Sequence, residues 1–397
     1  METALNNVYD SVIIRFSGEL FLKKLWTKKY YKKRLARNLK QTLKHHQIPY
    51  SELVRRHGRF YLKTSSAEEA AQALTKVFGI SSVSPAIETS SKLDDVIGKS
   101  LFLAASLLKE GDRFAVKCKR VGKQGYSSAD VRKLLGQRVL DEFGEKLGLS
   151  VDLGSPDVVL GVEVRDGQAF VYSQVLDAVG GMPLGTQPKL VGLFSGGTDS
   201  AVGLWLVMKR GCPVVPVYFD NSPFSDEATT ERAFRVAEVL FSWAVGFPRK
   251  VYVVSHGENL KRIMETHRKY SCLLCKRMMY RVAERLAEQL WAEGIVTGEA
   301  IGEQASQTLT NLRVLDSVVK QYPVHRPLLG FDKEETEALA RKIGTYEFSS
   351  SKAADCGAVP YQPSTKAKLE DVLKAEEKLD IEAMVTSSLE TIKIVEL

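Results

Sequence analysis

The sequence predicts an α/β protein in which two small α+β domains precede a larger doubly wound parallel-sheet domain. After residue 189, four apolar runs alternate with helical stretches, and strands that are apolar throughout belong to parallel sheets covered on both faces. Before residue 179, shorter strand-like runs are mixed with amphipathic helices. A chain of 397 residues is long enough for two or three such domains.

The first predicted domain covers residues 1–72. Residues 11–16 (SVIIRF) and 59–63 (RFYLK) have the composition of β-strands. Residues 27–46 are predicted to form a helix, because apolar side chains recur at every fourth position, at Tyr31, Leu35, Leu39 and Leu43. This segment therefore has the elements of a small α+β module.

The second predicted domain covers residues 73–178, and residues 179–189 are predicted to be a linker. The linker contains GGMPLG, a stretch rich in turn-forming residues. Helices are expected near 67–77, 92–109 and 128–146. Strands are expected at 114–120, 158–164 and 169–175.

The third predicted domain covers residues 190–397 and carries the parallel sheet. Its strands are expected at 190–194, 214–219, 251–255 and 295–298. Its helices are expected at 200–210, 226–245, 258–269 and 276–293. In open sheets of this kind, ligands bind beyond the carboxyl ends of the strands, so the functional site is expected there.

The positive charge of the chain is concentrated near its N-terminus. The net charge is +8, but residues 1–64 alone contain 15 Lys and Arg against 4 Asp and Glu, which leaves the rest slightly acidic. Trp26, Tyr30 and Tyr31 lie among these charges, a combination typical of a nucleic-acid partner. The alternative is a solvated, lysine-rich helix face.

The sequence also bears on location. No apolar run reaches 18 residues, and the N-terminus lacks the basic and apolar regions of a signal peptide. A cytoplasmic protein without a membrane anchor is expected. In a reducing compartment, five cysteines are too few for a disulfide framework, and a C-x-x-C pair is more often catalytic or metal-binding.

The first strand of the third domain ends in LFSGGTDSAVG, residues 193–203. Its two glycines allow a tight turn whose N–H groups can bind an anion where the next helix begins. The hydroxyl groups of Ser195, Thr198 and Ser200 add hydrogen-bond donors. Asp199 can order the loop or hold Mg²⁺ through water. A glycine-rich helix entry with a serine cap is the alternative. The motif residues are Ser195, Gly196, Gly197, Thr198, Asp199 and Ser200.

The string S-G-G-x-D-S resembles the PP-loop of ATP pyrophosphatases, which cleave ATP between the α and β phosphates. Segments 275–287, 297–316 and 324–347 closely resemble the tRNA 4-thiouridine synthase family, ThiI. Upstream, segments 15–24, 77–86 and 116–128 resemble the ferredoxin-like and THUMP domains of that family. The resemblance covers nearly the whole chain and implies a Rossmann-like PP-loop domain at residues 190–397.

This resemblance implies an ATP-dependent tRNA sulfurtransferase that forms 4-thiouridine at position 8. It implies ATP and Mg²⁺ as cofactors, tRNA as partner, and a homodimer. It also associates the chain with thiamine biosynthesis. Nucleotide contacts carried over by motif, besides the loop itself, are Leu193, Phe194, Phe219, Asp220, Arg277, Gly298 and Gln307. The chain departs from the common family pattern at Thr198 and at Glu303-Gln304.

The cysteines indicate the sulfur chemistry. Cys356 matches the family position that receives or relays sulfur, and Asp199, Cys272, Cys275 and Cys356 are the predicted catalytic residues. The chain stops at Leu397, too soon for the rhodanese domain of many relatives, so another sulfur route is expected, from sulfide or a cysteine desulfurase. Resemblance to rhodanese-less members implies an iron–sulfur cluster on Cys272, Cys275 and Cys356.

Alternatives to the cluster remain open: a persulfide and disulfide relay among the three cysteines, a zinc site, or simple packing. The C-x-x-C pair is expected to precede a helix beside Lys276 and Arg277, which favours thiolate. Cys118 and Cys212 are expected to be small core residues. His267 is the only histidine near the pair in sequence, and the other five are assigned no role.

Two other functions remain open. One is a PP-loop enzyme that thiolates another tRNA base, such as a cytidine. The other is a tRNA-binding module with a silent nucleotide site. The intact S-G-G-T-D-S string disfavours the second.

Overall fold

The computed structural model describes residues 8–20, 24–56, 58–351 and 356–397. The chain divides into two compact units, residues 1–183 and 184–397, and each is considered by itself. The predicted linker at 179–189 spans this division. No helix in the described ranges is both long enough and apolar enough to cross a lipid bilayer.

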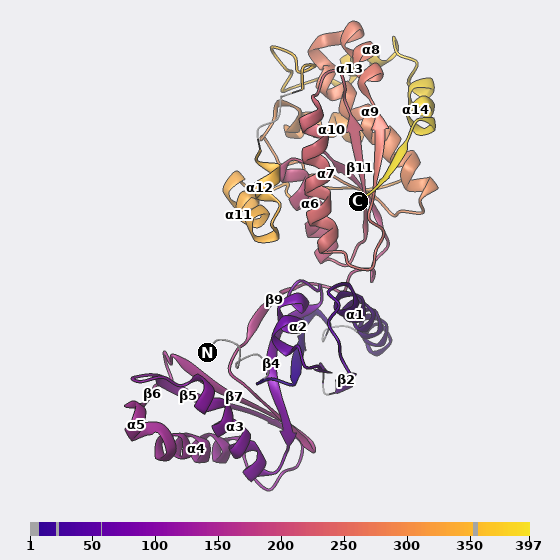
Figure 1. Ribbon diagram of the computed structural model, residues 1–397. Helices are drawn as coiled ribbons and strands as arrows, with labels where there is room; N and C mark the ends of the chain where they lie inside the picture. Colours follow the sequence, from indigo (N-terminus) through magenta and orange to yellow (C-terminus); the bar gives the residue numbers. More distant parts are fainter. Residues whose placement is uncertain (1–7, 21–23, 57, 352–355) are drawn as a thin grey trace. The chain divides into compact units, whose positions relative to one another are not determined.

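Unit 1 is built on one continuous sheet with helices packed against it (Figure 1). In the described residues its strands follow the order β2-β3-β1-β4-β8-β7-β5-β6, with β9 also paired to β4. The strands are β1 (Ser11–Phe16), β2 (Glu52–Arg56), β3 (Arg59–Lys63), β4 (Ile80–Ser90), β5 (Arg113–Val121), β6 (Ser150–Val151), β7 (Val158–Arg165), β8 (Gln168–Tyr172) and β9 (Leu176–Gly180). The helices are α1 (Leu25–His45), α2 (Ala67–Leu74), α3 (Leu93–Leu107), α4 (Ser128–Val139) and α5 (Glu145–Leu147).

The helix α1 forms because its apolar positions fall on one face. Leu35, Leu39 and Leu43 are fully buried, whereas Trp26 and its neighbouring lysines remain in solvent. The apolar face packs into a core that also takes residues from α2 and β4. The charged face is thereby left free for a partner.

Strand β4 joins the two halves of unit 1. Its first residues pair with β1 and β9, and its last four residues pair with β8. The core of the first half contains residues on both sides of the predicted boundary between residues 72 and 73 and continues to Ile87. Strand β9 likewise extends into the predicted linker and pairs with β4.

Unit 2 contains the predicted doubly wound sheet, in the strand order β14-β13-β10-β11-β12-β15. All pairs are parallel except β12 with β15. The strands are β10 (Leu190–Phe194), β11 (Val214–Asp220), β12 (Lys250–Ser255), β13 (Ile295–Val296), β14 (Val324–His325) and β15 (Lys393–Glu396). The sequence did not predict the two edge strands, because they are short and partly exposed.

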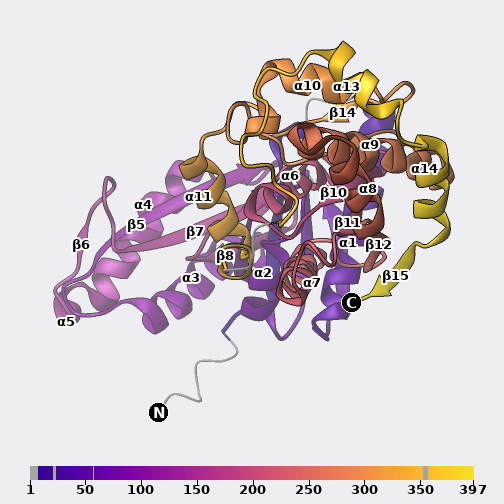
Figure 2. The same cartoon turned by 90° about the horizontal axis from the view of Figure 1, so that it is seen from above.

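Helices cover both faces of this sheet (Figures 1 and 2). One layer contains α6 (Thr198–Lys209), α7 (Glu227–Ser242), α11 (Lys333–Ile343) and α12 (Tyr346–Ser349). The other contains α8 (Gly257–His267), α9 (Ser271–Gln289), α10 (Leu309–Asp316), α13 (Leu369–Glu376) and α14 (Ile381–Glu390). This arrangement brings the carboxyl ends of β10, β11 and β13 to one edge of the sheet.

Candidate active site

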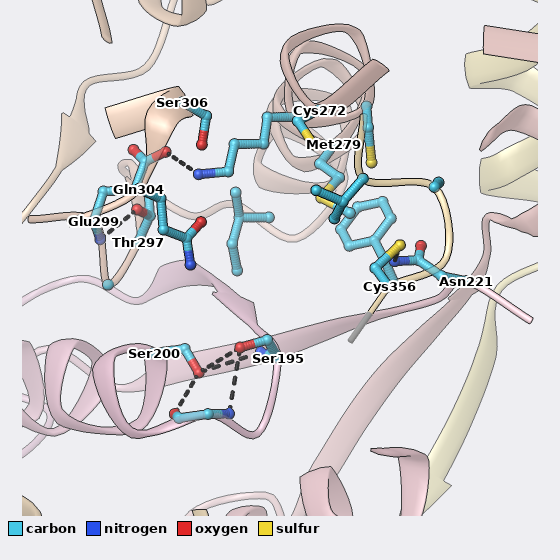
Figure 3. A pocket seen from close by; sticks show the side chains of 18 of the residues that line it. Ser195, Ser200, Asn221, Cys272, Met279, Thr297, Glu299, Gln304, Ser306 and Cys356 are labelled. Carbon is cyan, nitrogen blue, oxygen red and sulfur yellow. Dashed lines mark hydrogen bonds and ion pairs between the residues drawn. The ribbon is translucent and has the colours of Figure 1, made fainter. Parts of the chain in front are cut away.

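A cavity of about 830 Å³ opens at the carboxyl ends of β10 and β11. Figure 3 shows Ser195 and Ser200 on one side of it, and Cys272, Cys356 and Asn221 on another. This is where a doubly wound sheet binds its ligand. The predicted residues that line it are Leu193, Phe194, Ser195, Gly197, Asp199, Ser200, Phe219, Cys272, Cys275, Gly298, Gln307 and Cys356.

The turn between β10 and α6 is held by its own hydroxyl groups. The Oγ of Ser200 donates to the carbonyl oxygen of Gly197 at 2.9 Å and accepts from the N–H of Ser195 at 3.2 Å. Gly196 has a φ of +72°, and a Cβ added there would lie 2.4 Å from the Cα of Ala233 on α7. Only glycine fits, because both the backbone conformation and the contact with α7 exclude a side chain.

Gly298 brings another strand end against the same turn. A Cβ at this position would lie 2.4 Å from both the carbonyl carbon and the oxygen of Asp199. The segment after β13 therefore touches the first turn of α6 through backbone atoms. Thr198 lies outside the cavity lining, and its Oγ1 is 3.1 Å from the Oγ of Ser349.

Asp199 is held by a lysine that the sequence did not single out. The Nζ of Lys333 lies 3.3 Å from Oδ1 of Asp199 and 2.7 Å from Oε1 of Glu303. Lys333 is the first residue of α11, which a capping box between Asp332 and Glu335 starts at this point. Burial and the charge of Glu303 raise the pKa of Asp199.

Arg277, an expected nucleotide contact, is not among the residues that line the cavity. Its guanidinium is 1% exposed, donates to both oxygens of Glu376 at 2.8 and 2.7 Å, and reaches Ser317 at 2.7 Å. Burial opposes ionisation of Glu376, but hydrogen bonds from Arg277 and Arg281 lower its pKa to about 2. Arg277 is thus committed to a buried ion pair away from the cavity.

Lys276 faces the cavity instead. Successive residues on a helix point about 100° apart, so Lys276 and Arg277 belong to different faces of α9. The Nζ of Lys276 lies 3.1 Å from Oε1 of Glu299, and both residues line the cavity (Figure 3 shows Glu299).

Asp220 and Gln307 support the cavity walls. Oδ1 of Asp220 accepts from the N–H and the Oγ of Ser222 at 2.9 and 2.6 Å, which orders the loop after β11. Gln307 is 5% exposed, and its Oε1 accepts from the N–H of Ala300 at 3.3 Å. Asp220 lies outside the cavity lining, whereas Gln307 is part of it.

The helix α9 begins at Ser271, so both cysteines of the C-x-x-C pair lie inside it rather than before it. Cys275 is 8% exposed, and Cys272 is partly buried. Burial raises the pKa of both thiols, which contradicts the expected thiolates. Desolvation outweighs the helix terminus and the nearby Lys276.

His256 is a further residue that the sequence reasoning missed. It is fully buried, and its Nε2 lies 3.4 Å from the Sγ of Cys275. Burial lowers the pKa of His256 to about 4, so the ring is neutral. His256 and Cys275 are 19 residues apart, so the sequence did not indicate that they are in contact. The histidine closer in sequence, His267, stacks on Tyr270 instead.

Cys356 packs against the apolar cluster that contains Cys275, and its Sγ lies 4.0 Å from the amide nitrogen of Asn221. The N–H of Gly357 donates to the carbonyl of Phe224 at 2.8 Å and holds this segment to the loop after β11. Of the two remaining cysteines, Cys118 is buried as predicted, whereas Cys212 is partly exposed.

The three cavity cysteines suit soft metals in kind, because thiolates are the usual ligands of iron–sulfur clusters. They share one cavity, and the side chains around Cys275 and Cys356 are largely apolar. Within the part of the chain that the structure describes, no three His, Cys, Asp or Glu side chains are close enough to hold a metal ion. The donor set therefore fits a cluster in composition, while its sulfur atoms are not assembled around one point.

Sequence comparison agrees with this architecture. The family model for the thiamine biosynthesis protein ThiI matches residues 185–381, that for the ThiI ferredoxin-like domain residues 11–84, and that for THUMP residues 91–174. A protein of Methanosarcina acetivorans named "Probable tRNA sulfurtransferase" is 42% identical over 97% of this chain and 93% of its own length. The chain belongs to the ThiI family of tRNA sulfurtransferases.

Other relatives of this ThiI family member also match it over nearly the full length of both chains. A protein of Saccharolobus islandicus with the same name is 36% identical over 94% of this chain and 96% of its own length. The crystal structure of a 4-thiouridine synthetase–RNA complex with bound ATP superposes with a TM-score of 0.88. The two chains are 32% identical, and the match covers 98% of this chain and 99% of that one. The predicted family and fold are thereby confirmed.

Proposed function

We propose that this ThiI family member is an ATP-dependent tRNA sulfurtransferase that converts uridine 8 of tRNA to 4-thiouridine. The observation that carries the proposal is the formed S-G-G-T-D-S turn, which lines the same cavity as Cys356. Support comes from the matching structure, a 4-thiouridine synthetase with RNA and ATP bound. To replace a carbonyl oxygen with sulfur, an enzyme must first activate that oxygen and then present a sulfur atom to the same carbon. An adenylating loop and a thiol in one cavity meet both requirements.

The reaction has two balanced steps. Uridine O4 attacks the α-phosphorus of ATP, pyrophosphate leaves, and the N3 proton is lost. A sulfur nucleophile then attacks C4, and AMP leaves with the former O4 as one of its phosphate oxygens. The protein binds the phosphates through the N–H groups of the turn, and Lys276 supplies positive charge at the cavity wall.

Mg²⁺ is part of the proposal. The carboxylate of Asp199 lines the cavity at the turn, and an oxygen ligand beside phosphates fits this ion. When bound, Mg²⁺ neutralises charge on the departing pyrophosphate. We expect Asp199→Asn to abolish tRNA-dependent pyrophosphate release while leaving tRNA affinity within about twofold, because the proposed tRNA contacts lie on α1 and do not include Asp199.

We propose that Cys272, Cys275 and Cys356 would hold an iron–sulfur cluster. When bound, such a group would supply inorganic sulfide at the cavity. Sulfide would replenish it directly, whereas sulfur from a cysteine desulfurase would arrive as a persulfide and need a thiol reductant that supplies two electrons. Iron and acid-labile sulfide content of protein purified without oxygen test this proposal. We expect both to be lost in each single Cys→Ala variant and kept in Cys212→Ala.

An iron-free wild type that still thiolates tRNA would overturn the cluster. It would favour a persulfide on Cys356 with the C-x-x-C pair as the reducing dithiol. Zinc found in place of iron would favour a structural site. These outcomes leave the adenylation step untouched, because it depends on the turn at residues 195–200.

Unit 1 is proposed to bind the tRNA. Its helix α1 exposes 79% of Trp26 among lysines and arginines, which suits a phosphate backbone with unpaired bases. The chain is also proposed to act in the cytoplasm as a homodimer, which sedimentation of the pure protein tests. Mass analysis of tRNA nucleosides from a deletion strain tests the target base, since loss of 2-thiocytidine rather than 4-thiouridine would contradict uridine 8.

A further inference from the structure

The wall of the cavity formed by α7 and the loop before it carries polar atoms without a partner. Among the described residues, Nε of Arg232 and Oγ of Ser225 are buried and make no hydrogen bond, and both residues line the cavity. A buried polar group left unpaired destabilises the fold, because it has lost its hydrogen bonds to water. Native proteins rarely leave such groups unpaired except where a ligand or water completes them.

Arg232 also differs from the other cationic side chains at the site in whether a carboxylate neutralises its charge. Lys276 pairs with Glu299, and Lys333 pairs with Asp199 and Glu303. In the described ranges no carboxylate pairs with Arg232, whose Nη1 instead donates to the carbonyl oxygen of Ser351 at 3.3 Å. Its positive charge is therefore available to an anion in the cavity.

The position of Arg232 identifies the anion. The next residue, Ala233, is the one that packs on Gly196 of the S-G-G-T-D-S turn. Helices α6 and α7 contact each other directly (Figure 1). Arg232 belongs to α7 and lines the cavity. A guanidinium beside a phosphate-binding turn is suited to bidentate contact with phosphate oxygens.

We propose that Arg232, with the Ser225 hydroxyl, binds the pyrophosphate portion of ATP and stabilises it as it leaves. This inference rests on the proposed adenylation activity and assigns to Arg232 the role that the sequence assigned to Arg277. The free Nε and the charge of the side chain supply what the buried Arg277 cannot. The contact strengthens as charge develops on the departing group.

The test compares Arg232→Met and Arg232→Lys with the control Arg235→Met. Arg235 lies one turn further along α7, is 59% exposed in its side chain, and among the described residues forms an ion pair only within the helix, with Glu231. Calorimetry with ATP and with inorganic pyrophosphate, both without tRNA, measures binding. Single-turnover pyrophosphate release with saturating ATP and tRNA measures the chemical step.

We expect Arg232→Met to weaken binding of ATP and pyrophosphate about 10- to 100-fold and to slow pyrophosphate release by at least as much, since a charge-assisted hydrogen bond is lost. Arg232→Lys should recover part of both, and Arg235→Met should match wild type. Unchanged pyrophosphate affinity in Arg232→Met would overturn the proposal, and so would reduced tRNA affinity with normal ATP binding. Failure of adenylation itself would appear in the wild type, whereas pyrophosphate binding remains measurable without it.

Discussion

The buried ion pair between Arg277 and Glu376 indicates that Arg277 stabilises the fold and does not bind the nucleotide. Replacing Arg277 with Met removes two hydrogen bonds to a carboxylate that is 7% exposed. The pKa of Glu376 falls from an ordinary 4.5 to about 2, and a difference of this size corresponds to about 3 kcal/mol. Breaking a buried pair costs about 3–5 kcal/mol, and Arg281 still pairs with Glu376, so about 3 kcal/mol of lost stability is expected.

Urea unfolding of Arg277→Met measures this loss. Arg285→Met is the control, because Arg285 lies on the same helix and pairs with Glu382 in solvent, where an ion pair contributes about 0–1 kcal/mol. ATP affinity of the folded fraction should stay within about twofold of wild type, since Arg277 does not reach the cavity. Unchanged stability together with ATP binding weakened tenfold or more would show that Arg277 is a phosphate ligand and not a structural residue.

Three further predictions follow from the contacts. Gly298→Ala should abolish pyrophosphate release and cost about 1–3 kcal/mol of stability, because its Cβ would overlap the backbone of Asp199, whereas Gly330→Ala meets open space and should be neutral in both assays. The lowered pKa of Glu376 stabilises the fold above about pH 5, so unfolding midpoints should fall as the pH drops from about 5 towards 2, and less steeply in a Glu376→Gln variant. Trp26→Ala should weaken tRNA binding about 5- to 100-fold without changing the unfolding midpoint, because the ring is exposed and can stack on a base.

The sequence predicted what is encoded locally. The turn at residues 195–200 depends on contiguous glycines and hydroxyl groups after an apolar strand, so its geometry could be inferred directly. The parallel strands of unit 2 were predicted from their uniform apolarity, because both faces of each strand are covered. In the sheet of unit 2 the missed elements, β14 and β15, are short edge strands whose residues lack that signal. In unit 1 the strands β2, β4, β6 and β9 were also missed, and β4 is a long central strand.

Residues whose position depends on distant partners could not be predicted. Lys276 and Arg277 are neighbours on one helix, and the choice of which faces the cavity is made by Glu376, 99 residues after Arg277. His256 contacts Cys275 only because the end of β12 lies beside the beginning of α9 at the cavity. The C-x-x-C pair lies inside α9, and its burial reverses the thiolate expectation that came from the adjacent basic residues.

The central claim is that ATP activates O4 of uridine 8 before sulfur replaces it. The most direct measurement uses tRNA labelled with ¹⁸O at O4 of that uridine, incubated with ATP and a sulfide source, followed by mass spectrometry of the AMP and pyrophosphate released. Adenylation at O4 places one ¹⁸O atom in AMP for each 4-thiouridine formed, and none in pyrophosphate. Unlabelled AMP accompanying 4-thiouridine would contradict adenylation at O4.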